Sequence, residues 1–146
     1  MEILFEAYFK CPYRHGVLKN SKQIFYNKGT GKPFVSKSDD AAKCEKWMLM
    51  KLNIEKIKKR IHEPISCDLN AKFLFYFPRT VYYTKKGERS LKLPDLSNLY
   101  CLPEDVLQNT GIIINDTQIC AHTGSRRLPI DGHEYYLKIE LSKFNE

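Results

Sequence analysis

The sequence lacks the features of a secreted, membrane-spanning or disulfide-stabilised protein. Its five cysteines are odd in number and widely spaced, and no two form a C-x-x-C pair, so neither a disulfide framework nor a cysteine-rich zinc site is indicated. No apolar run approaches the roughly 20 residues that span a bilayer. Glu2 and Glu6 stand where a secretory leader carries positive charge. We therefore expect a cytoplasmic protein in a reducing compartment, with no membrane partner.

Positive charge, in contrast, is in excess. Lys and Arg number 24 against 17 Asp and Glu, which gives a formal net charge of +7. This balance favours a polyanionic partner, of which nucleic acid is the commonest. No Lys or Arg lies between Leu93 and Ser125. The carboxylates of that stretch could hold a divalent cation or simply favour helix starts, and they are Asp95, Glu104, Asp105 and Asp116.

The order of the expected elements predicts a single α+β domain over residues 1–146. Alternating apolar residues predict a strand over 3–9, and apolar runs predict further strands over 71–77, 111–114, 118–122 and 135–141. A long helix is expected from about residue 39 to about residue 61. A short helix is expected over 103–108, with Pro103 in its first turn. The expected architecture is a mixed β-sheet with one long and one short helix.

Two features of the sequence have alternative interpretations. A stripe along the long helix predicts core packing, with a dimer contact as the alternative, and consists of Trp47, Met50, Ile54, Ile57 and Ile61. Segment 81–93 is expected to be extended or a hairpin around Gly87. Its cations could contact phosphates or protect an exposed strand edge, and they are Lys85, Lys86, Arg89 and Lys92.

Two short segments carry the candidate chemistry. They are Pro94-Asp95-Leu96-Ser97-Asn98-Leu99 and Ile114-Asn115-Asp116-Thr117-Gln118-Ile119. The first leaves an extended stretch, and the second lies where a short helix returns to a strand. A strand–helix–strand unit would bring Asp95 and Asp116 together at one edge of the sheet, where two carboxylates can share a Mg²⁺ ion.

This pair of motifs resembles that of the RusA-type Holliday junction resolvases of bacteria and their phages. The family pattern reads P-D-x-D-N-L, then a helix, then D-D-x-Q-I, and PDLSNL and NDTQI stand in that order at matching distance. Segments 26–37 and 73–77 and the helix with Trp47 extend the resemblance over nearly the whole chain. It implies a homodimeric, Mg²⁺-dependent endonuclease, with Mn²⁺ as a substitute, that cuts four-way DNA junctions symmetrically in recombination and repair. A bacterial or phage-infected cytoplasm is the implied location.

Carried over residue by residue, Asp95 and Asp116 match catalytic, metal-binding aspartates of the family. Asn98 and Gln118 match the family's Asn and Gln. Ser97 stands where the family has a second metal-binding Asp.

Two further positions depart from the family pattern. Cys101 stands where the family has a Lys thought to assist catalysis, and Asn115 replaces the first Asp of the D-D pair. The loss of a metal ligand should lower the rate of cleavage far more than the affinity for DNA. Glu104 is a candidate substitute ligand.

Three functions stay open on the sequence. The first is an active junction endonuclease that uses Mg²⁺ and no organic cofactor, and the second is a junction-binding protein that has lost cleavage. The third is a basic domain that binds single-stranded nucleic acid. The residues expected to contact phosphates are Lys85, Lys86, Arg89, Lys92, Arg126 and Arg127. Cys120 and His122 share a strand face, where packing is favoured over half a zinc site. His15 and His62 receive no role.

Overall fold

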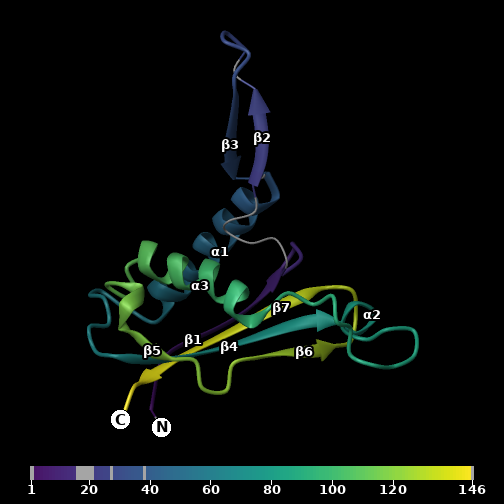
Figure 1. The fold of residues 1–146 in the computed structure, drawn as a ribbon. Coiled ribbons are helices and arrows are strands. Elements are labelled where there is room, and N and C mark those ends of the chain that lie inside the picture. The colour runs from purple at the N-terminus through teal and green to yellow at the C-terminus, as the bar shows by residue number, and fades with distance from the viewer. Residues whose placement is uncertain (1, 16–21, 27, 38, 146) are drawn as a thin grey trace.

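The computed structural model describes residues 2–15, 22–26, 28–37 and 39–145, which form one α+β domain on a mixed sheet, as expected (Figure 1). The strands are β1 (Ile3–Cys11), β2 (Lys22–Tyr26), β3 (Pro33–Lys37), β4 (Leu69–Pro78), β5 (Ile119–Ala121), β6 (Arg126–Ile130) and β7 (Tyr135–Lys143). The helices are α1 (Asp39–Lys58), α2 (Arg79–Tyr82) and α3 (Leu96–Asn109), with a 3-10 turn η1 (Asp116–Gln118). None of the described helices is both long and apolar enough to cross a bilayer.

The main sheet determines the direction of every segment around the candidate motifs. Its order is β1-β7-β4-β5, and β6 pairs with the later part of β4, after the residues that pair with β5. β7 is antiparallel to both of its neighbours, whereas β5 and β6 run parallel to β4. Ile119 lies opposite Leu69, and Arg127 lies opposite Phe75. The chain that follows α3 therefore runs parallel to β4. Helix α3 runs antiparallel to β4, which brings the chain back to the start of that strand.

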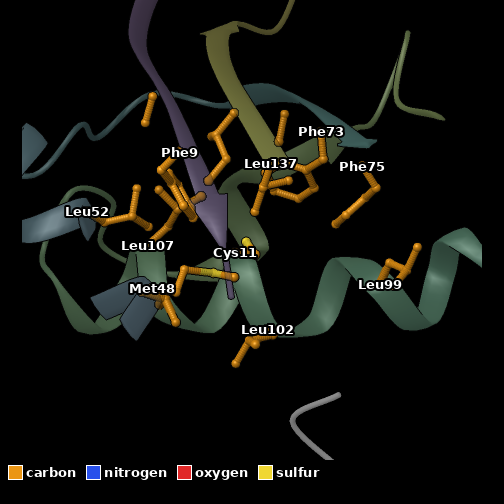
Figure 2. Close-up of a cluster of buried hydrophobic side chains, with 14 of the residues drawn as sticks. Phe9, Cys11, Met48, Leu52, Phe73, Phe75, Leu99, Leu102, Leu107 and Leu137 are labelled. Atoms are coloured by element: carbon orange, nitrogen blue, oxygen red, sulfur yellow. The ribbon is translucent and has the colours of Figure 1, made fainter. Parts of the chain in front are cut away.

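The core lies between one face of this sheet and the helices α1 and α3 (Figure 1). Every second residue of β1, β4 and β7 points into it, because successive side chains of a strand alternate between faces. Figure 2 shows Leu99, Leu102 and Leu107 of α3 in the same cluster as Phe73 and Leu137 of the sheet. The other face of the sheet is covered by none of the described helices.

The helix near the first motif is longer than expected. α3 begins at Leu96 rather than at Pro103, so Pro103 lies inside the helix. A proline there provides no N–H for the carbonyl one turn earlier, and in an exposed helix it would be strongly unfavourable. Here the ring is buried beside Leu99 and Leu102. Burial of apolar surface offsets the missing hydrogen bond.

The expectation that the Trp47 stripe of α1 packs into the core is wrong for most of its members. The buried residues of α1 are Ala41, Cys44, Met48 and Leu52, whereas Met50, Ile54 and Ile57 are 45%, 40% and 76% exposed. A different stripe of α1 thus faces the core, where α1 packs against the sheet and α3. A contact between copies stays a prediction for this exposed stripe.

Segments 81–93 and 111–114 also differ in part from the expectation. Segment 81–93 begins in α2 and then forms a turn, closed by a single bridge between Tyr83 and Arg89. Residues 111–114 form no strand, because their only pairing is a bridge between Ile113 and Ile65. These short pairings reflect tight turns that apolar runs do not reveal.

His15, which received no role from the sequence, is a buried part of the core. Its Nε2 lies 3.0 Å from the carbonyl oxygens of both Tyr76 and Tyr136, to which a ring N–H can donate. Its ring packs edge-on against Phe75 and Phe77. Burial lowers the pKa of His15 to about 4, although the two backbone hydrogen bonds partly oppose that shift. The ring is therefore neutral in the folded protein at neutral pH.

The low pKa of His15 predicts a loss of stability in mild acid. The folded value lies below the unfolded value of about 6.5, so the unfolded chain gains a proton first as the pH falls. Stability should fall between about pH 6.5 and about pH 4, by up to about 3 kcal/mol, with no further contribution below that window. His15→Gln should flatten this dependence in urea unfolding at several pH values, whereas His62→Gln, at an exposed position, should not. Equal pH dependence in His15→Gln and the parent would refute the assignment.

Candidate functional site

The first motif forms the start of α3. Asp95 is the N-cap residue, with extended backbone angles, and its side chain makes no capping hydrogen bond. The Asp95 carbonyl accepts instead from the backbone N–H groups of Asn98 and Leu99, both at 3.2 Å. The exposed carboxylate thus stands at the positive end of the helix dipole, a favourable position for an anion.

The two residues of this helix start that depart from the RusA-type pattern are exposed. They are Ser97 and Cys101, and Asn98 between them is exposed as well. The Cys101 thiol contacts the carbonyl of Ser97 at 3.7 Å, one turn earlier. No second carboxylate follows Asp95 in this part of the helix until Glu104. The start of α3 therefore offers a metal ion one carboxylate, that of Asp95.

The second motif is shaped by its Asn and Gln rather than by its aspartate. The Asn115 side chain accepts from Thr117 N at 2.9 Å and caps η1. The Gln118 Oε1 accepts from the backbone N–H groups of Ile114 and Asn115, at 2.7 Å and 2.9 Å. Its Nε2 donates to the carbonyls of Ile65 and Cys67, at 2.8 Å and 3.0 Å. Gln118 thus ties the loop to the segment that precedes β4, and both residues have structural roles.

Asp116 is held beside the far end of α3. Its backbone N–H donates to the side-chain Oε1 of Gln108 at 3.0 Å. Gln108 lies one residue before the last residue of α3. Asp116 therefore lies near the C-terminal end of the helix that Asp95 begins.

Glu104 and His122 pair in the middle of the seam, which is the contact between α3 and the chain that follows it, residues 116–127. Glu104 Oε1 lies 2.7 Å from His122 Nε2, and His122 Nδ1 lies 2.9 Å from the carbonyl of Ala71. The His122 ring also stacks on Tyr100, with centroids 3.9 Å apart. Glu104 is thus engaged by His122, away from both motifs, which does not fit a substitute ligand for Asp95. His122 therefore packs and forms hydrogen bonds, as expected from the sequence, which favoured packing over half a zinc site at this position.

These contacts show that α3 and the returning chain lie antiparallel to each other. Arg127 Nη1 donates to the carbonyl of Pro94 at 3.0 Å, at the start of α3. Gln108 meets Asp116 at the other end. With a rise of 1.5 Å per residue, α3 separates Asp95 from Gln108 by about 19 Å. The expected meeting of Asp95 and Asp116 at one edge is not brought about within a single chain.

A Mg²⁺ ion bound by both Asp95 and Asp116 would need their carboxylates far closer than the two ends of α3 are. Its oxygen ligands lie about 2.1 Å from the ion, so two ligands of one ion have oxygens within about 4 Å of each other. Among the residues that the structure describes, no group of three or more His, Cys, Asp or Glu side chains could hold a metal ion. Asp105, on the same helix, adds no third ligand to either end.

The expected phosphate contacts divide between two places. Lys85, Lys86, Arg89 and Lys92 are exposed, and together they form the basic tongue, residues 84–92, which leads directly to Asp95. Its turn is closed by the hydrogen bond from Thr84 N to Glu88 O, at 2.7 Å. Arg126 is exposed and belongs to the opposite sheet face from Arg127, since neighbouring strand residues alternate. Arg127 donates to Pro94, so it supports the start of α3.

The chain matches no protein-family model, and no curated protein matches it. The resemblance to RusA-type resolvases therefore rests on the two motifs, their spacing and the further segments described with them in the sequence.

Proposed function

We propose that this protein binds branched DNA and that a single chain has little or no cleavage activity. The separation of Asp95 and Asp116 along α3 carries the proposal, because a two-carboxylate metal centre needs both at one point. The net charge of +7 and the exposed basic tongue support DNA as the partner. Phosphate contacts of this kind position a protein on DNA and do not require a catalytic metal.

The position of Asp95 supports a specific consequence of the substitution at residue 97. Both residues are exposed at the start of α3, next to the basic tongue. A carboxylate at position 97 would add a second hard oxygen ligand at the helix N-terminus, near bound phosphates. Mg²⁺ is commonly held by one or two carboxylates together with phosphate oxygens.

Ser97→Asp should therefore introduce metal-dependent cleavage into a protein that otherwise only binds. We expect the parent to bind a labelled four-way junction in EDTA and to cut it at least about 100-fold more slowly in Mg²⁺ or Mn²⁺ than the variant, the order of effect of one electrostatic group in a hydrolytic site. Native gels measure binding, and denaturing gels measure cutting. Ser97→Asn, of similar size and without charge, serves as the control.

Equal cutting by the parent and by Ser97→Asp would contradict the proposal and favour an active endonuclease. A parent that fails to bind the junction in either condition would remove branched DNA as the partner.

A second candidate is an endonuclease whose metal site is completed by a partner subunit. Asp95 and Asp116 mark the two ends of one helix, and the helix face between them is exposed at Ser97, Cys101 and Gln108. Two copies with antiparallel α3 helices would place each Asp95 next to the partner's Asp116. Two equivalent sites would follow from the two-fold symmetry of such a homodimer.

Mixing two inactive variants distinguishes a shared site from one within a chain. If the sites are shared, a mixed dimer of Asp95→Asn and Asp116→Asn chains keeps one intact site and has one doubly altered site. Such mixtures should regain nicking of one junction strand, at up to about a quarter of the parent's rate per dimer formed after random subunit exchange. If each site lies within one chain, every site carries a change and no activity returns. Each variant incubated alone serves as the control.

A further inference from the structure

The uncovered face of the main sheet carries a cluster of three tyrosines. Tyr8 of β1, Tyr76 of β4 and Tyr136 of β7 share this face, because the core-facing positions of these strands are their immediate neighbours. The Tyr8 and Tyr136 rings are stacked, with centroids 5.4 Å apart and planes at 11°. Tyr76 meets Tyr8 edge-on at 6.1 Å. Tyr8 is 54% exposed.

A groove runs from these rings over the edge of β1. Its volume is about 580 Å³, and it is lined by Tyr8 and Tyr76 together with two lysines and two glutamates, which are Lys59, Lys138, Glu6 and Glu55. β1 is an edge strand of the sheet, so the groove is open on that side. The Tyr8 and Tyr76 side chains that line it are therefore accessible from solvent.

The charges around the tyrosines favour an anionic ligand. Lys10, Lys72, Lys138 and Arg126 lie on this face, against the carboxylates Glu6 and Glu140. Glu140 is neutralised within the face, since Lys138 and Lys72 lie 3.1 Å and 3.6 Å from its oxygens. Lys10 and Arg126 are exposed on either side of the rings. A chain of phosphates crossing the sheet would meet cations on both sides of the tyrosines.

A sheet face with exposed aromatic rings and flanking cations has the chemistry that binds unpaired bases. Bases stack on aromatic side chains without regard to sequence, while cations follow the phosphate backbone. Duplex DNA has no exposed base face and cannot use such rings. Burial, and after it the neighbouring Tyr136 and Tyr76, raise the pKa of the Tyr8 phenol, so the ring is neutral at physiological pH and does not repel phosphate.

We propose that this face binds single-stranded nucleic acid, with bases stacked on Tyr8 and its neighbours and phosphates on Lys10, Lys138 and Arg126. The inference does not rest on Asp95, Asp116 or the basic tongue, which lie on other surfaces. Self-association through the same face is less favourable, because two copies would have to bury the row of Glu6, Glu140 and Lys72.

Fluorescence anisotropy with labelled (dT)15 and (rU)15 tests the proposal on the full chain. Tyr8→Ser should weaken binding at least about fivefold, the smallest effect expected for one lost base stack. Tyr8→Phe keeps the ring and should bind within about twofold of the parent. Tyr26→Ser removes a tyrosine that is even more exposed than Tyr8, from the antiparallel pair β2–β3, and it should bind as the parent does. Whichever strand binds more tightly identifies DNA or RNA as the preferred source, and either supports the proposal.

Three results would overturn the inference. The first is that Tyr8→Ser binds the strands as tightly as the parent. The second is that Tyr26→Ser loses as much affinity as Tyr8→Ser. The third is that Tyr8→Ser changes the molecular mass of the protein in solution but not its affinity for the strands. A four-way junction measured in parallel separates this proposal from the preceding one, because Tyr8→Ser should leave junction binding unchanged. Lys85→Gln combined with Lys86→Gln should weaken the junction more than the single strands.

Discussion

The parallel pairing of β5 and β6 with β4 is the constraint on which the rest of the structure depends. Because the chain must return to the start of β4 before it can run along that strand, it needs a connection that travels backwards over the sheet. α3 is that connection, and it buries Leu99, Leu102 and Leu107 on the core face while it does so. Its two ends consequently lie at opposite ends of the seam, and so do the two acidic motifs that flank it.

This arrangement divides the molecule into regions with different chemistry. Asp95 and the basic tongue lie together at the start of α3, where a helix dipole and cations favour anions. The centre of the seam is filled by the Glu104–His122 pair and its stacked Tyr100. The far end is a loop held by the Asn115 and Gln118 side chains. The uncovered sheet face, with its tyrosines, faces away from all three. Exposed cations lie at two of these regions, the start of α3 and the uncovered sheet face, whereas none of the regions brings Asp95 and Asp116 together.

Much of the fold could be predicted from the sequence, because it depends on patterns that residues create locally. Alternation in β1 and the apolar run of β4 led to the mixed sheet, and one long helix was placed within a few residues of α1. The side of α1 that faces the core could not be found this way. Both of its stripes have helical spacing, and only the packing of α1 against the sheet and α3 decides which of them is buried. The burial of His15 depends on strands far away in the sequence, which no local pattern encodes.

The structure places the two motifs at the two ends of a helix, as expected, but not beside each other. The two motifs were identified correctly as the segments that flank a helix, and Asn115 and Gln118 do form hydrogen bonds that shape the loop. The start of α3 was placed too late because Pro103 suggested a helix beginning. A short helix would have allowed the two aspartates to approach each other, whereas the longer one separates them. The tyrosine cluster escaped notice because its members come from three strands that only the folded sheet brings together.

The separation of Asp95 and Asp116 within one chain is the claim that most needs a direct measurement. Asp95→Cys and Asp116→Cys can be introduced together in a chain whose exposed Cys101 and Cys120 are replaced by Ser. A disulfide requires Cα atoms within about 7 Å, so mild oxidation followed by mass spectrometry reports whether the positions meet. We expect no disulfide within a chain, and any disulfide that forms should join two chains. Efficient formation of a disulfide within single chains would contradict the separation and restore a two-aspartate metal centre.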